Sequence, residues 1–414
     1  MNSFLAADIL LPQVKSLEKW AVIACDQFTS EPIYWDRVRK LAKGVPSAYH
    51  LILPEAELGT PREFENIREI HDSMEEYLND NLFRTYPHSY IYIERTLENG
   101  SIRRGLLGMI DLEDYEFAPG NTAPIRSTEN TVLERLPPRQ QIRRYASIEL
   151  PHVLLLCDDT EHMLIEPIGE RKDFLPKLYD FELMLGGGRI AGWLIIGKAA
   201  EEFDETLTRY TKTVGSKYEG VPGVPMVFAV GDGNHSLATA KTFYEKLKSA
   251  NPGKDFSGHP ARYALAELEN IHDPAQVFEP IHRVVFKTDP HRLLAALEQS
   301  CCAAGGYPIE WFIGKTHGTV YLDKSKGMLA VGILQNFLDD YLAANDGRID
   351  YIHDDEVLIG LADHDDTIGF LLPAMEKRQL FPSVIADGVL PRKTFSMGHS
   401  REKRYYLEAR MIQK

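Results

Sequence analysis

The sequence predicts a mixed α/β fold, in which helices flank a mixed sheet. Short apolar runs such as residues 226–230 alternate with segments whose apolar residues recur at helical spacing. The pair Asn99-Gly100 joins two β-prone segments and predicts an antiparallel hairpin, because Asn and Gly accept the positive φ of a tight turn. The 414 residues exceed one ordinary core, and 44% hydrophobic with 26% charged residues is typical of globular proteins.

In the first part of the chain we expect two helices, then the hairpin, a loop and a third helix. Ser30 is the expected cap of the first helix, and Pro32 suits its first turn. The ranges are residues 32–44 and 61–82 for the helices, 89–95 and 102–110 for the hairpin strands, 115–124 for the loop, and 126–144 for the third helix.

In the rest of the chain, the sequence pattern predicts strands that alternate with helices. Expected strands are residues 152–157, 181–188, 189–197, 226–230, 261–268 and 283–286, and expected helices are 198–211, 237–248 and 290–302. Composition shifts near residues 119–124 and 253–260. We therefore divide the chain into an N-terminal α/β part with the hairpin (1–120), a phosphate-binding core (121–260) and a C-terminal α/β part (261–414).

The formal charge of −15 disfavours nucleic acid as a partner, because most of the surface repels polyanions. A small phosphate-bearing ligand is still allowed, since local donors act at short range. Four irregularly spaced cysteines predict a reducing compartment. The N-terminus has no export signal and no apolar run spans a bilayer, so we expect a cytoplasmic protein without a membrane partner; a homo-oligomer is left open.

The segment Gly231-Asp232-Gly233-Asn234-His235-Ser236 lies between an expected strand and an expected helix. Such a turn presents backbone N–H groups and the positive end of a helix dipole to an anion, and the glycines let a ligand approach the backbone. Asp232 favours Mg²⁺-linked phosphate chemistry or an acid-base role, because a bare carboxylate repels phosphate. His235 would donate to a phosphoryl oxygen and Ser236 would cap the helix. The alternative is that Asp232 and Asn234 only shape the turn.

Four segments resemble signatures of the prokaryotic family called domain of unknown function 1015. Residues 230–240 resemble its Asp-Gly-His-His-Arg-like signature, although Asn234-His235-Ser236 replaces His-His-Arg. Residues 126–131 with Arg139 resemble its His-Glu-x-Thr segment, except for Ser127 where histidine is common. Residues 279–283 resemble Pro-Thr-His-Arg, and residues 390–394 resemble Met-Pro-x-Lys-Ser. The segments follow the family's order from about residue 21 to residue 393.

The turn is also similar to the phosphate loop of free serine kinases with a ParB/sulfiredoxin-like fold. The resemblance implies a nucleotide-binding core of that kind plus additional α/β elements, with ATP or ADP held at Asp232, Gly233, Asn234 and His235 and with Mg²⁺ at Asp232. The expected activity is transfer of a phosphoryl group to a small hydroxylated metabolite, with free L-serine the leading acceptor. A non-catalytic nucleotide-binding regulator and a phosphate-releasing hydrolase are the alternatives.

Further candidates lie outside the turn. Glu129 is the expected base that accepts the hydroxyl proton, or else a first-turn glutamate favoured by a helix dipole, with Glu31 in reserve. Arg126 lies near Glu129 and is expected to contact phosphate. His282 and Arg283 would clamp a carboxylate or phosphate, or else form a surface pair. Lys393 would add positive charge, or else belong to a solvated basic tail. His353-Asp354-Asp355 and His364-Asp365-Asp366 are expected to cap helices and shape turns rather than bind metal.

Overall fold

The computed structural model of the protein describes residues 2–25, 28, 31–131, 136–150, 153–391, 393–398 and 400–413. Within them, eleven strands form the main sheet in the order β10-β11-β4-β5-β13-β9-β12-β7-β6, with β1 beside β5 and β2 beside β4. Most neighbours are antiparallel, but β13 and β9, β12 and β7, and β6 and β7 run parallel. The expected mixed sheet with flanking helices is confirmed. Its strands are β1 (Phe4–Leu5), β2 (Ala7–Pro12), β4 (Phe83–Thr96), β5 (Ile102–Asp111), β6 (Tyr115–Glu116), β7 (Ile125–Ser127), β9 (Leu154–Cys157), β10 (Lys177–Glu182), β11 (Arg189–Ile195), β12 (Phe228–Asp232) and β13 (Tyr263–Asn270).

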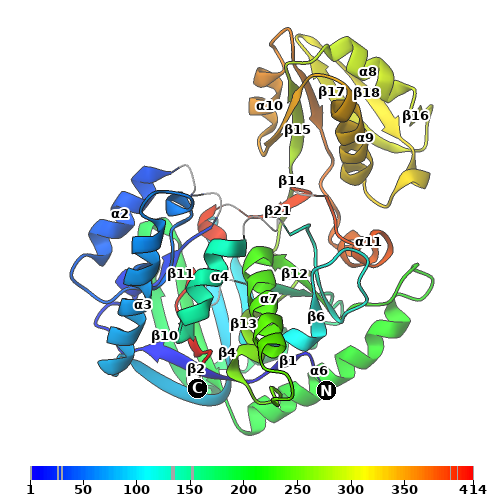
Figure 1. The fold of residues 1–414 in the computed structure, drawn as a ribbon. Coiled ribbons are helices and arrows are strands. Elements are labelled where there is room, and N and C mark those ends of the chain that lie inside the picture. Colours follow the sequence, from blue (N-terminus) through cyan, green and yellow to red (C-terminus); the bar gives the residue numbers. More distant parts are fainter. Residues whose placement is uncertain are drawn as a thin grey trace.

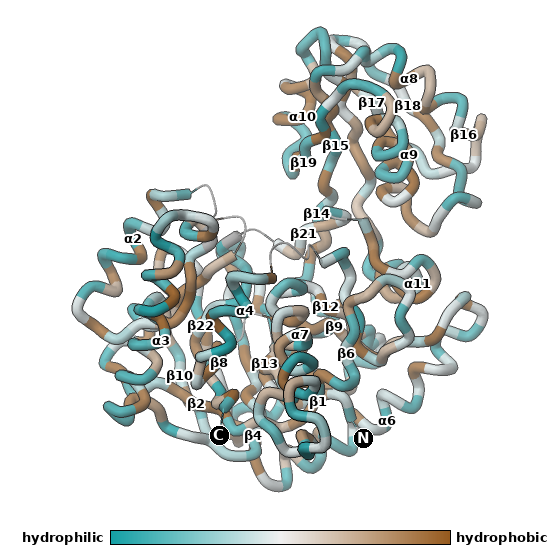
Figure 2. Tube along the Cα trace, in the orientation of Figure 1, coloured by the Kyte–Doolittle hydropathy of each residue, from teal (hydrophilic) through white to brown (hydrophobic). Residues whose placement is uncertain are grey.

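Alternation along β4 gives the main sheet two buried faces. Tyr90 and Tyr92 point to one face, which α6 (Lys198–Lys217) covers with an apolar stripe that includes Phe203. The residues between and after them, Ile91 and Ile93, point to the opposite face, which lies under α1 (Leu17–Trp20), α2 (Pro32–Ala42) and α3 (Glu63–Asn79). Figure 2 shows apolar segments concentrated between these layers.

A smaller lobe carries its own antiparallel sheet, in the order β16-β18-β17-β20-β15-β19. Figure 1 shows this lobe apart from the main sheet, joined through the two-stranded pair of β14 (Phe278–Pro280) and β21 (Phe395–Met397) and the segment that contains α11 (Leu380–Asp387). Its elements are β15 (His282–Phe286), α8 (Pro290–Glu298), β16 (Cys301–Cys302), β17 (Tyr307–Ile313), β18 (Thr316–Leu322), α9 (Ala330–Ala344), β19 (Arg348–Ile352), α10 (Asp355–Leu361) and β20 (Ile368–Leu371).

The C-terminal segment returns from the smaller lobe and pairs with early parts of the chain. Strand β22 (Tyr405–Tyr406) pairs with β3 (Val22–Ile23), and β23 (Arg410–Met411) pairs with β8 (Ile148–Glu149). Two further helices, α4 (Leu136–Tyr145) and α7 (Asn234–Ala250), pack side by side (Figure 1). The C-terminal segment is therefore part of the larger lobe.

Several predicted elements are confirmed, including the hairpin of β4 and β5 and the helices α2, α3, α6 and α7. The prediction that a helix begins at Arg126 is wrong: Ile125–Ser127 is strand β7, hydrogen-bonded to β12, and the described helix is Leu136–Tyr145. The helix expected to reach Cys302 ends at Glu298. The proposed cap Ser30 and the strand start at His152 lie outside the described residues. The three-part division stays a prediction, and β13 belongs to the main sheet although it follows residue 260.

Candidate phosphate-binding site

The turn between β12 and α7 joins the strand and the helix that the sequence predicts, but the prediction that Ser236 caps the helix is wrong, because the helix already begins at Asn234 and Gly233 is its cap residue. Strand β12 ends at Asp232, Gly233 adopts a left-handed conformation with φ of +85°, and the 17-residue helix α7 begins at Asn234. Gly231 is required by close packing, because a Cβ there would lie 2.7 Å from Leu156 and 2.9 Å from Met397. Except for the buried Asn234, the residues from Gly231 to Ser236 are partly exposed, so a ligand can reach the start of the helix.

The Asp232 carboxylate contacts its own turn and a lysine that is far away in the sequence. Its Oδ1 accepts a hydrogen bond from the Gly233 N–H at 2.8 Å, and Lys403 Nζ lies 3.5 Å from its Oδ2. Next to it, Asn234 Oδ1 is buried and has no hydrogen-bond partner in the part of the chain that the structure describes. The helix start therefore combines partial positive charge with a lysine and with an unsatisfied polar atom.

Glu129 lies at the same edge of the sheet as Asp232. Strands β7 and β12 are parallel with Ser127 opposite Val230, and Glu129 follows β7 as Asp232 ends β12. Thr128 fixes this strand end, because its hydroxyl donates to the Val230 carbonyl at 2.7 Å. Glu129 also forms a parallel bridge with Leu390, which leads into the segment that contains Lys393. The carboxyl ends of parallel strands are where open α/β sheets bind ligands.

The C-terminal segment also places two cations close enough to act on His353 of the smaller lobe. Burial lowers the pKa of His353, and the nearby Lys393 and Lys403 lower it further, whereas Glu279 opposes them. Lys393, Lys403 and Glu279 thus all lie within electrostatic reach of His353. Sequence reasoning did not group Lys403, His353 and Glu279 into one site, and Lys403 had only the basic run around Arg401 as a signal.

Two buried arginines of the main sheet position the backbone on either side of Lys403. Arg103 donates to the Glu402 carbonyl at 2.7 Å and Arg95 donates to it at 2.9 Å. Arg95 also donates to the carbonyls of Arg401 and Lys403. Burial, with repulsion from Arg103, lowers the pKa of Arg95 to about 10. These contacts fix the lysine relative to β4 and β5.

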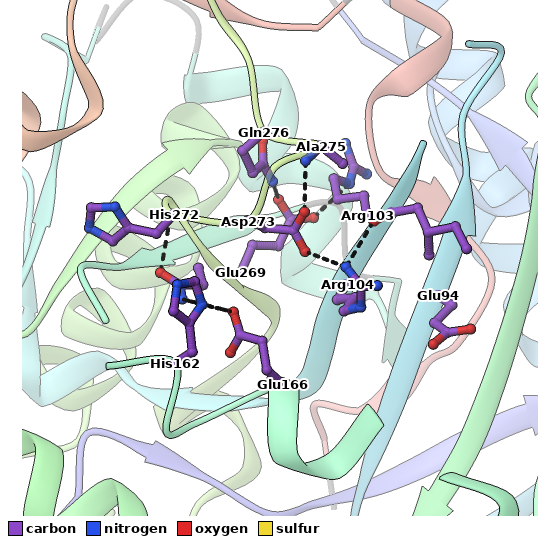
Figure 3. Close-up of polar contacts among 12 residues, drawn as sticks. Glu94, Arg103, Arg104, His162, Glu166, Glu269, His272, Asp273, Ala275 and Gln276 are labelled. Atoms are coloured by element: carbon purple, nitrogen blue, oxygen red, sulfur yellow. Dashed lines mark hydrogen bonds and ion pairs between the residues drawn. The ribbon is translucent and has the colours of Figure 1, made fainter. Parts of the chain in front are cut away.

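Arg103 belongs to a second polar cluster that the sequence did not reveal (Figure 3). It lies 3.0 Å from the Glu269 carboxylate, which also accepts from Gln276, and Arg104 lies 3.4 Å from Asp273. Burial raises the pKa of Glu269 to about 7, although the Arg103 charge lowers it. These contacts connect β5, the end of β13 and the loop that follows β13.

Three predicted contact residues lie away from this edge or are used elsewhere. Arg126 is buried and donates to the carbonyls of Ala123 at 2.8 Å and Val224 at 2.7 Å, so it shapes a loop. The surface pair considered for His282 and Arg283 is wrong, because both are buried in the smaller lobe. His282 contacts Asp355 at 2.7 Å through Nε2, and Arg283 donates to Gln335 at 2.7 Å.

The histidine-aspartate triplets lie at a helix start and in a turn, as predicted. Asp354 caps α10 by accepting from the Val357 N–H at 2.9 Å, and the His364 carbonyl accepts from Thr367 in a turn. No group of three metal-ligating side chains occurs among the residues described. The reserve candidate Glu31 precedes α2 and lines a cavity with Arg37 and Arg401, whereas Asp26, Gln27, Thr29 and Ser30 fall outside the described ranges.

A family model described as "Protein of unknown function (DUF1015)" matches residues 9–410. The chain belongs to this family. No curated protein matches it. None of the helices described in this family member is long and apolar enough to cross a bilayer.

Solved structures match at low identity. A C-terminally truncated SbnI from Staphylococcus aureus is 9% identical, with a TM-score of 0.36 and coverage of 72% of this chain and 85% of that one. A free serine kinase in complex with AMP is 12% identical, with a TM-score of 0.35 and coverage of 74% and 90%. A conserved hypothetical protein from Pyrococcus furiosus is 13% identical, with a TM-score of 0.32 and coverage of 72% and 90%.

Proposed function

We propose that this protein binds the phosphates of ATP or ADP at the start of α7 and transfers a phosphoryl group to a small hydroxylated metabolite. The observation that supports this most directly is the convergence of the α7 N-terminus, Asp232, Lys403 and Glu129 at one edge of the sheet. Phosphoryl transfer depends mainly on positioning and on neutralising charge, so such a set of groups is sufficient.

Each group has a chemical task in this proposal. The backbone N–H groups at Asn234 to Ser236 and the Lys403 ammonium hold phosphate oxygens, and His235 donates to one of them. Glu129 accepts the proton of the acceptor hydroxyl as that oxygen attacks the terminal phosphorus and the P–O bond to the leaving nucleotide, ADP from ATP or AMP from ADP, breaks. Lys393 adds positive charge to the same region.

Asp232 is the carboxylate that would hold Mg²⁺, which supplies charge neutralisation at the phosphates when bound. Mg²⁺ keeps several water ligands and is held by one or two carboxylates with substrate phosphates, so a single aspartate fits. The described residues offer no complete protein cage for the ion, so Mg²⁺ is expected to bind together with the nucleotide. Arg126, His282 and Arg283 have no part in this proposal, because their guanidinium and imidazole groups are engaged elsewhere.

The test incubates the purified protein with ATP or ADP, Mg²⁺ and a panel of hydroxyl amino acids, and measures the phosphorylated product. Free L-serine is the first acceptor to test, because the loop resembles that of free serine kinases. Phosphoserine formation would support the kinase. Nucleotide binding without turnover would favour a regulator, phosphate release without any acceptor would favour a hydrolase, and no nucleotide binding would refute all three.

A further inference from the structure

A cavity of about 170 Å³ lies between α4, the first turns of α7 and the sheet strands beneath them. It begins at Ser236, close to the candidate phosphate-binding site, and apolar side chains such as Ile142, Leu237 and Leu265 form most of its wall. A dry cavity of about 150 Å³ accommodates benzene, so this one has room for a body of about six carbon atoms. The apolar wall excludes a strongly polar occupant unless a partner for its charge is present.

Arg143 supplies such a partner. This residue of α4 lines the cavity, and its side chain is only 12% exposed. Its Nη1 contacts Glu149 Oε2 at 2.6 Å, whereas Nε and Nη2 are buried without a hydrogen-bond partner in the described part of the chain. Nε and Nη2 form one edge of the planar guanidinium, a fork that matches two oxygens of a carboxylate. Buried donors left unpaired are costly, so this fork points to a ligand.

The charges around the fork favour an anion. Glu149 is shared, because its Oε1 lies 3.0 Å from Arg410 Nη2 and also accepts from the Leu265 N–H at 3.0 Å. Two guanidinium groups therefore contact one buried carboxylate, and the exposed Asp8 acts on Arg410 from outside. One further negative charge would balance the second guanidinium, whereas a neutral nucleobase would leave it uncompensated.

We propose that this cavity binds a small monocarboxylate with an aliphatic or aromatic body. The two oxygens would accept from Nε and Nη2 of Arg143, and the body would lie against Ile142, Leu237 and Leu265. The proposal goes beyond the nucleotide site, and each can fail without the other because different residues make the contacts.

Calorimetric titration of the full chain with benzoate and isovalerate, and with the neutral benzamide, tests this site. Both carboxylates should bind, and benzamide should bind at least about tenfold more weakly because it cannot pair with the positive charge. Arg143→Gln should weaken benzoate binding by about tenfold to a hundredfold. Arg144→Gln, an exposed neighbour on the same helix, should leave binding unchanged.

A second variant tests the cavity without disturbing the contacts of Glu149 with Arg143 and Arg410. Ala146→Leu fills part of the cavity without changing any charge, and it should abolish benzoate binding while ADP binding is retained. Absence of binding by both carboxylates, equal binding of benzamide, or displacement of benzoate by adenosine or guanosine would overturn the proposal. If the wild-type protein did not bind ADP, the proposed kinase function would be refuted, but the proposed carboxylate site would not be affected.

Discussion

Lys403 is the residue that links the C-terminal segment to the phosphate-binding turn. Its ammonium lies 3.5 Å from Asp232 Oδ2, and its side chain is only 12% exposed. A partly buried cation interacts more strongly with a phosphate than a solvated one, because fewer water molecules screen it. Arg95 and Arg103 hold the adjacent backbone, so the lysine is positioned before any ligand arrives.

Replacement of Lys403 by glutamine should therefore weaken nucleotide binding. We expect the Kd for ADP to rise about tenfold, which corresponds to the loss of one charge-assisted contact. Lys198→Gln is the control, because that side chain is 87% exposed and lies on α6. Titration with ADP measures both variants, and equal Kd values for the two would contradict a phosphate role for Lys403.

Asp232→Asn separates a catalytic role from a structural one. Asparagine keeps an oxygen that accepts from the Gly233 N–H, so the turn should persist, but it removes the charge that would hold Mg²⁺. We expect turnover with ATP or ADP to fall at least about a hundredfold while the Kd changes only a few-fold. An equal loss in turnover and affinity would argue against catalysis by this carboxylate.

Glu269 should make stability depend on pH. Burial raises its pKa from 4.5 to about 7, so the folded protein binds a proton that the unfolded chain releases between these values. Its contribution is fully present below the unfolded pKa, and the free energy of unfolding should fall by roughly 1–3 kcal/mol as pH rises through about 4.5 to 7. Urea unfolding measures this, and Glu269→Gln should flatten the profile. A wild-type profile as flat as that of the variant would contradict the pKa shift.

At the scale of single elements, sequence patterns correctly predicted those elements whose contacts are made between residues close together in the sequence. The hairpin at Asn99-Gly100 and the strand and helix around Gly231 are contiguous in sequence, and the structure confirms both. Strand β7 was expected to be a helix because Arg126-Ser127-Thr128-Glu129 has the composition of a helix start. Its hydrogen bonds come from β12, about a hundred residues later, and no local pattern reports such a partner.

Gly231→Ala should disturb the packing of β12 against β9 and β21. The added Cβ would lie 2.7 Å from Leu156 and 2.9 Å from Met397, so β12 must shift relative to β9 or β21. We expect a loss of about 1–3 kcal/mol in the free energy of unfolding, as in overpacked cores. Gly215→Ala on the exposed face of α6 meets no atom within 4 Å and should stabilise the protein by about 0.5–1 kcal/mol. Equal midpoints of thermal unfolding for the two variants would refute the packing explanation.

At the scale of the whole molecule, the candidate site depends on segments that only the fold brings together. Asp232 was predictable because its turn is contiguous, whereas Lys403, His353 and Glu279 come from regions that the sequence separates widely. Arg126 and Arg283 show the reverse error: arginines that looked suited to phosphate are used on carbonyl groups and on Gln335. Composition gives the charge of a residue but not which partner the fold places beside it.

Replacement of Arg404 tests whether its buried ion pairs anchor the C-terminal segment in the larger lobe. Its side chain is 1% exposed, its Nε lies 2.6 Å from Glu267, and its Nη2 pairs with the buried Glu408. Arg404→Met leaves both carboxylates without this cation, so we expect a loss of about 3–5 kcal/mol in the free energy of unfolding. Displacement of the segment should also weaken ADP binding, because Lys403 is the preceding residue.

Arg378→Met is the control, since that side chain is 80% exposed and its pair with Glu376 should contribute less than about 1 kcal/mol. Urea unfolding of both variants decides the matter, and equal stability would show that the buried pairs do not anchor the segment.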